Sequence, residues 1–106
     1  MSTLKSFFVL GFLSSILVSP AALADVFDEG YDFGYDSAYN FCKSKGKELS
    51  TIEEMEIEVD IVEEFQDGCL EGFKDGINYN RTCRNYIRQT EGAATKMWQA
   101  RAKACK

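Results

Sequence analysis

The chain has 106 residues, with 12 basic against 17 acidic side chains, four cysteines, one proline and no histidine. At this length it forms one small domain at most, and a hydrophobic content of 45% excludes a disordered tail. The net charge of −5 argues against nucleic acid as a partner, because phosphate binding depends on clustered lysine and arginine.

Residues 1–24 match a secretory signal peptide. Lys5 precedes an uncharged apolar run, and the small residues Ala22 and Ala24 form the cleavage end. The apolar run is too short for a membrane anchor, which needs about 20 residues. We therefore expect cleavage after Ala24, a periplasmic or secreted location, and a single helical domain over residues 25–106 with a net charge of −6.

All four cysteines lie in the exported part of the chain: Cys42, Cys69, Cys83 and Cys105. An even number of cysteines in an oxidising compartment predicts two disulfides. A zinc site of four thiolates is the alternative, but no two cysteines have the C-x-x-C spacing and no histidine can complete a mixed site. We expect disulfides and no bound metal.

Three segments have the helical period, in which apolar residues recur on one arc at about 100° per residue. They run over about residues 26–45, 50–78 and 82–105. Overlapping capping boxes that begin at Ser50 and Thr51 open the second and longest segment.

Together these segments predict an all-α fold, a three-helix antiparallel bundle stapled by two disulfides. In that arrangement Cys42 at the end of the first helix comes level with Cys105 at the end of the third. We therefore expect a Cys42–Cys105 disulfide between those helices. The remaining pair, Cys69–Cys83, would close the turn between the second and third helices.

A nine-residue pattern, F-x-x-G-x-x-x-G-[YF], occurs at residues 27–35 and again 38 residues later at 65–73. Glycine at every fourth position leaves one helix face without side chains, so another backbone can approach closely. Each glycine costs about 1 kcal/mol relative to alanine inside a helix, which implies a packing reason. We expect helix-to-helix contact at this stripe; a ligand groove with a glycine floor is the alternative. The glycine stripe consists of Gly30, Gly34, Gly68 and Gly72.

Charge is divided along the chain. Residues 25–75 carry 16 acidic and four basic side chains, whereas residues 76–106 carry one acidic and seven basic ones. We expect the basic third helix to dock on the acidic first two through these charges. The alternative is a membrane-surface or envelope-stress protein that uses the basic helix, although anionic lipid would repel the acidic remainder.

Catalysis is not expected. The lack of histidine removes the commonest general base, and oxidised cysteines cannot act as nucleophiles. Glu54 and Glu58 fall within the apolar arc of the long helix, where two carboxylates could serve glycoside hydrolysis. Antiparallel packing would bring Arg101 level with them. We expect these three residues to form a partly buried structural ion pair, with no enzyme activity and no cofactor.

Aromatic side chains offer candidates for contact with a partner protein. Phe33, Tyr39 and Tyr79 lie near the edges of the predicted apolar arcs, so they are the aromatic residues expected at the surface.

The segment Cys69-Leu-Glu-Gly72-Phe73-Lys-Asp-Gly76-Ile77 resembles the C-x-x-G-[YF]-x-x-G motif of small periplasmic immunity proteins. Those proteins protect bacteria from type VI secretion amidase effectors. The resemblance implies a helical, disulfide-containing inhibitor that binds a toxin and occludes its active site. The small size, the predicted export and the lack of catalytic motifs suit that role.

Overall fold

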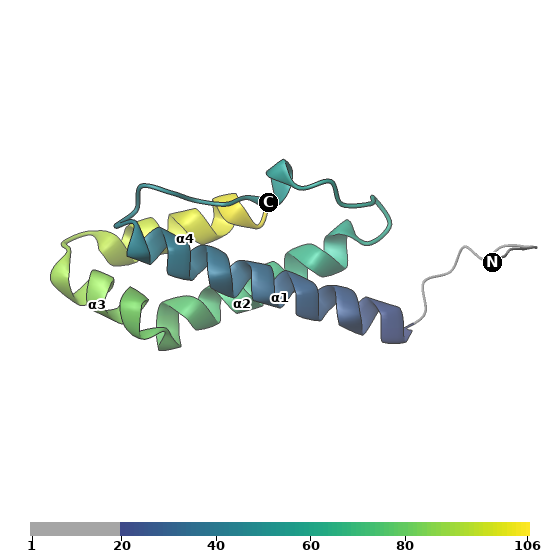
Figure 1. Ribbon diagram of the computed structural model, residues 1–106, viewed down its shortest axis with the longest axis horizontal. Helices are drawn as coiled ribbons and strands as arrows, with labels where there is room; N and C mark the ends of the chain where they lie inside the picture. Colours follow the sequence, from purple (N-terminus) through teal and green to yellow (C-terminus); the bar gives the residue numbers. More distant parts are fainter. Residues whose placement is uncertain (1–19) are drawn as a thin grey trace, which may run out of the picture.

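The computed structural model describes residues 20–106; most of the predicted signal peptide, residues 1–19, lies outside the described residues. The described chain contains four α-helices, one 3₁₀-helix and no strand (Figure 1). None of these helices is long and apolar enough to span a membrane. The all-α prediction is confirmed. The elements are α1 (Pro20–Lys43), η1 (Ile52–Glu54), α2 (Val62–Tyr79), α3 (Arg81–Gln89) and α4 (Ala93–Ala104).

The two long helices, α1 and α2, pack along each other and run in the same direction (Figure 1). Gly30 of α1 lies against the backbone of Phe65 in α2, and Gly34 lies against Cys69, so both helices advance together along the contact. The connection over residues 44–61 carries the chain back to the level where α1 begins (Figure 1). The predicted three-helix antiparallel bundle is therefore wrong in direction and in number of helices.

The predicted glycine stripe forms the contact between α1 and α2. A Cβ atom added to Gly30 would overlap the carbonyl oxygen of Phe65. In the same way, a Cβ atom added to Gly68 would overlap the carbonyl oxygen of Phe27. The other two glycines of the stripe make the equivalent contacts one turn further along. Because Phe27 and Phe65 are equivalent in the 38-residue repeat, a local two-fold symmetry exchanges these contacts. The prediction of helix packing is confirmed.

The predicted start of the long helix, residues 50–61, is an irregular connection instead. Thr51 and Glu54 do form a capping box, but it caps only the single turn of η1. After this turn the sequence places acidic side chains three and four residues apart, where they would repel each other in a helix, among β-branched residues. α2 therefore begins only at Val62.

The predicted third helix is broken into α3 and α4. Thr90 has an extended backbone, and Gly92 has a φ of +80°, in the left-handed region that favours glycine. The break allows α4 to turn back and run antiparallel to α2, as Figure 1 shows.

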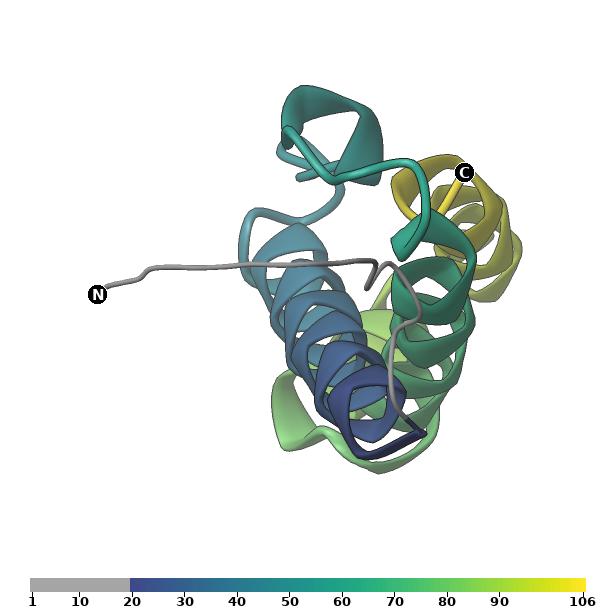
Figure 2. The same cartoon turned by 90° about the vertical axis from the view of Figure 1, so that its right-hand side faces the viewer.

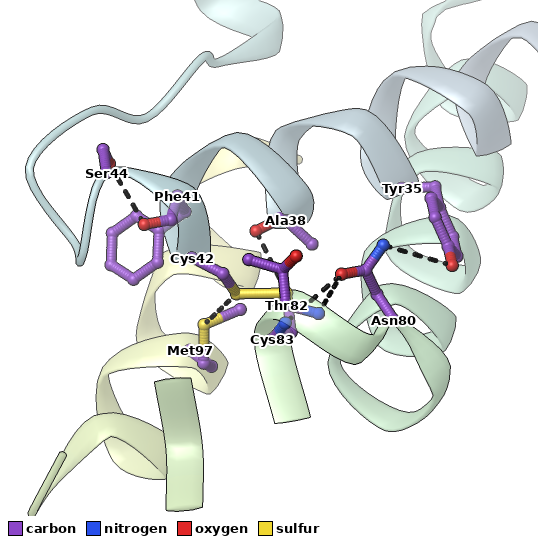
Figure 3. The surroundings of a disulfide bond; sticks show 9 residues. All are labelled: Tyr35, Ala38, Phe41, Cys42, Ser44, Asn80, Thr82, Cys83 and Met97. Carbon is purple, nitrogen blue, oxygen red and sulfur yellow. Dashed lines mark hydrogen bonds between the residues drawn. A yellow bond between two sulfur atoms is a disulfide. The ribbon is translucent and has the colours of Figure 1, made fainter. Parts of the chain in front are cut away.

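The cysteines pair as Cys42–Cys83 and Cys69–Cys105, with Cα–Cα distances of 5.0 and 5.6 Å. The predicted pairs, Cys42–Cys105 and Cys69–Cys83, are therefore wrong. Because α1 and α2 are parallel, their C-terminal ends lie together, which brings Cys42 to the first turn of α3 (Figure 3). The antiparallel α4 then returns Cys105 to the middle of α2. Two disulfides indicate an oxidising compartment outside the cytoplasm.

All four helices contribute to the core, and the connection packs over one side of it (Figure 2). Phe73 of α2 and Met97 of α4 are fully buried. The sulfur of Met97 lies 3.3 Å from the Cys42 sulfur, so the first disulfide is part of this core (Figure 3). The core therefore holds α3 and α4 firmly against the helix pair.

Candidate protein-binding face

The predicted ion pair does not form. Glu54 and Glu58 are exposed: Glu54 ends the single turn of η1 and Glu58 lies in the irregular connection, so neither is on α2. Arg101 is half-buried on α4, where its Nε donates a hydrogen bond to the carbonyl oxygen of Leu70 at 2.8 Å. Its guanidinium lies 5.5 Å from the ring centre of Trp98. A backbone carbonyl and an aromatic ring thus take the place that sequence analysis assigned to two carboxylates.

The three predicted partner-binding residues differ in how accessible they are. Phe33 is half-buried and packs on the core, with its ring centre 5.8 Å from that of Phe65. Tyr39 is also half-buried, and the Lys43 ammonium lies 5.8 Å from its ring centre. Tyr79, at the end of α2, is 72% exposed. Of the three, Tyr79 is therefore the residue best placed to contact a partner.

Three arginines adjoin Tyr79 on the next helix. Arg81, Arg84 and Arg88 of α3 are all exposed, and their spacing of three and four residues places them on one stripe of the helix. The opposite side of α3 is buried through Cys83 and Tyr86. We call Tyr79 and the three arginines, with Asn85 between them, the arginine face.

The arginine face encloses an open hollow of about 370 Å³, lined by these five residues. Within it, the Nη2 atom of Arg88 donates a hydrogen bond to Asn85 Oδ1 at 2.7 Å. Asn85 therefore orients the guanidinium of Arg88.

Local structure holds α3 in place. Asn80 caps the helix, since its Oδ1 accepts hydrogen bonds from the backbone N–H groups of Thr82 at 2.9 Å and Cys83 at 3.2 Å (Figure 3). The Asn80 Nδ2 donates to the hydroxyl of Tyr35 on α1 at 3.5 Å. The Cys42–Cys83 disulfide adds a covalent link to α1. The arginine face is thus carried by a helix that is tied to the body of the molecule at its first turn.

The positive charges of the arginine face form no ion pair with the rest of the described chain. Within residues 20–106, the ion pair is Lys74 with Glu71, whose Nζ and Oε1 atoms lie 3.2 Å apart, and no arginine of the face pairs with a carboxylate. The basic segment docks on α1 and α2 through buried apolar side chains such as Tyr86 and Met97. The predicted docking of the basic segment on the acidic helices therefore involves, within the described chain, no ion pair of the α3 arginines.

Sequence analysis missed the three arginines, although a signal was present. Their spacing opposite Cys83 and Tyr86 gives a short helix with one apolar and one cationic side. The prediction of a single helix over residues 82–105 merged that pattern with α4 and obscured it.

A separate polar contact joins α1 to α2. The Tyr31 hydroxyl donates a hydrogen bond to Asp75 Oδ2 at 2.5 Å. This hydrogen bond, together with partial burial and the negative charge of Asp75, raises the pKa of Tyr31 from 10.0 to about 12.

This shift predicts a pH dependence of stability. The unfolded chain loses the Tyr31 proton near pH 10 and the folded chain near pH 12, so the contribution is complete below pH 10 and disappears as the pH rises to 12. In an alkaline titration followed by phenolate absorbance, Tyr31→Phe should remove the component with a midpoint of about 12. The exposed control Tyr79→Phe should leave that component in place. A Tyr31→Phe titration that keeps it would contradict the assignment.

The arginine face has the chemistry of a binding surface. A planar guanidinium donates two parallel hydrogen bonds to a carboxylate or a phosphate, and a row of three can hold several such groups in register.

Residues 20–106 contain no cluster of three or more histidine, cysteine, aspartate or glutamate side chains that could hold a metal ion. Comparisons of the chain with known protein families, with characterised proteins and with solved structures found no match.

Proposed function

We propose that this protein is an exported, disulfide-stapled helical module that acts by binding another protein through the arginine face. The observation that carries the proposal is an exposed tyrosine beside three arginines that have no carboxylate partner in the described chain. An immunity-type protein in the periplasm would inhibit the partner that it binds. Such inhibition requires only that the module cover the partner's active site.

The composition of the face supports a protein partner. Tyrosine and arginine are the residues that, with tryptophan, most often carry binding energy at protein interfaces. The capped and disulfide-linked α3 is already ordered, so binding loses little conformational entropy. Exposed polar groups around a hollow also match the wet, polar rim of transient interfaces.

The proposal is tested by capture of a partner from the envelope and culture fractions of the source organism. The oxidised protein should enrich a specific protein, and free oxidised protein should compete for it. The Arg84→Glu/Arg88→Glu variant should lose at least tenfold of the captured amount, because reversed charges oppose the partner's groups.

A matched variant controls for net charge. Lys96→Glu/Lys103→Glu makes the same change on exposed positions of α4. It should capture the partner as well as the parent does. Equal capture by the parent and by Arg84→Glu/Arg88→Glu would refute the assignment of binding to this face.

A further inference from the structure

We propose that the arginine face binds a carboxylate-rich segment of the partner, which places glutamate or aspartate side chains on Arg81, Arg84 and Arg88. This inference rests on the proposed function and adds the chemistry of the partner. The three positions extend over about 10 Å of α3, given a rise of 1.5 Å per residue. That length matches a short acidic peptide segment with two or three carboxylates.

Two of the three arginines do not stabilise the helix that carries them; only Arg88 lies in the last turn, where the helix dipole favours a cation. Arg81 lies at the first residue of α3, where the positive end of the helix dipole disfavours a cation, and the first turn has no acidic residue. Arg84 repels Arg81 three residues before it and Arg88 four residues after it. Because local energetics oppose Arg81 and Arg84, a binding partner of opposite charge accounts for these two arginines better than folding does.

The net charge of the whole molecule favours a short acidic segment as the partner and disfavours an extended anionic surface. The exported chain carries a net charge of −6, and 16 of its 17 acidic side chains lie on α1, on α2 and in the connection; the other, Glu91, lies between α3 and α4. Charges separated by more than about 8 Å in water are largely screened at physiological ionic strength. A peptide segment that contacts only α3 therefore meets three arginines and, on the helix itself, no carboxylate. A membrane or a nucleic acid duplex extends further and faces the acidic helices as well.

The rest of the face adds contacts that a carboxylate-rich segment can use. The Tyr79 ring borders the hollow and offers an apolar surface for the stem of a glutamate or for a neighbouring apolar side chain. The hydrogen bond from Arg88 to Asn85 fixes one guanidinium, which reduces the entropy lost on binding.

The test uses a fluorescent peptide of ten glutamates as the probe and measures its anisotropy with the oxidised protein. The peptide should bind the parent, and binding should weaken as salt is raised. Arg81→Gln/Arg84→Gln/Arg88→Gln should weaken binding at least tenfold. The matched triple variant Lys96→Gln/Lys103→Gln/Lys106→Gln changes net charge by the same amount and should bind within about twofold of the parent. Circular dichroism establishes that each variant is folded.

Three outcomes would overturn the inference: no binding of the glutamate peptide at low salt, equal weakening in both triple variants, or sedimentation of the parent with phosphatidylglycerol vesicles that is lost only in the arginine variant. These outcomes are separable from failure of the proposed function. If the glutamate peptide does not bind while partner capture still depends on Arg84 and Arg88, the proposed binding function is retained and only the inferred carboxylate chemistry is rejected.

Discussion

Replacement of Gly72 by alanine is expected to lower the free energy of unfolding by about 3 kcal/mol, because the added methyl group has no space. A Cβ atom at Gly72 would overlap the carbonyl oxygen of Tyr31, which is rigid backbone in the middle of α1. The two helices must move apart to admit it, which opens the core along their length. The gain of about 1 kcal/mol in helix propensity does not offset that loss.

The measurement is urea unfolding followed by circular dichroism. Asp67→Ala is the matched control, since Asp67 is an exposed residue in the same helix. Its free energy of unfolding should change by less than about 0.5 kcal/mol. The local two-fold symmetry also requires Gly34→Ala to behave like Gly72→Ala, because Gly34 meets the carbonyl oxygen of Cys69 in the equivalent way. A Gly72→Ala protein as stable as the parent would contradict the close packing of α1 on α2.

The glycine stripe could be predicted from the sequence because its signal is local. A glycine at every fourth position of a helix lies on one face, whatever the rest of the fold does. The direction of packing could not be predicted in the same way. A face without side chains accepts a parallel or an antiparallel neighbour equally well. The length of the connection decides between the parallel and the antiparallel arrangement. Sequence analysis predicted part of this connection as helix.

That mistake arose from residues 50–61. Their apolar residues can be fitted to a helical arc, but Met55-Glu-Ile-Glu-Val-Asp60 also alternates apolar and acidic residues. In the structure Val59, an apolar residue of the helix predicted over residues 50–78, is 88% exposed. Repulsion among closely spaced carboxylates and the need to return the chain to the start of a parallel α2 both favour an irregular segment. The errors in the disulfide pairs and the ion pair follow from this one element.

The candidate site was only partly predictable. Tyr79 was identified because it lies at an arc edge, and it is exposed. Phe33 has the same position in its own arc, yet it packs on Phe65 because the parallel α2 covers it. The arginines were assigned to docking on the acidic helices, since the sequence shows charge asymmetry but not which side of α3 is buried. Burial of Cys83 and Tyr86 decides that question.

The two disulfides are expected to have the largest effect on stability. They link cysteines 41 and 36 residues apart, so in the chain-entropy model each stabilises the fold by about 4 kcal/mol. We expect Cys42→Ala/Cys83→Ala and Cys69→Ala/Cys105→Ala each to lower the free energy of unfolding by about that amount. Urea unfolding gives the values, with the oxidised parent as reference.

The two double variants should differ in binding even though they lose similar stability. The Cys42–Cys83 bond ties the first turn of α3 to α1, so its removal loosens the helix that carries the arginine face. The Cys69–Cys105 bond ties α4 to α2 and leaves α3 attached. Under conditions where both variants are folded, the Cys42→Ala/Cys83→Ala protein should bind the captured partner more weakly than the Cys69→Ala/Cys105→Ala protein.

Peptide mapping of the non-reduced parent should find the disulfides Cys42–Cys83 and Cys69–Cys105. Recovery of Cys42 joined to Cys105 would reject the parallel arrangement of α1 and α2, because that pair requires the antiparallel one.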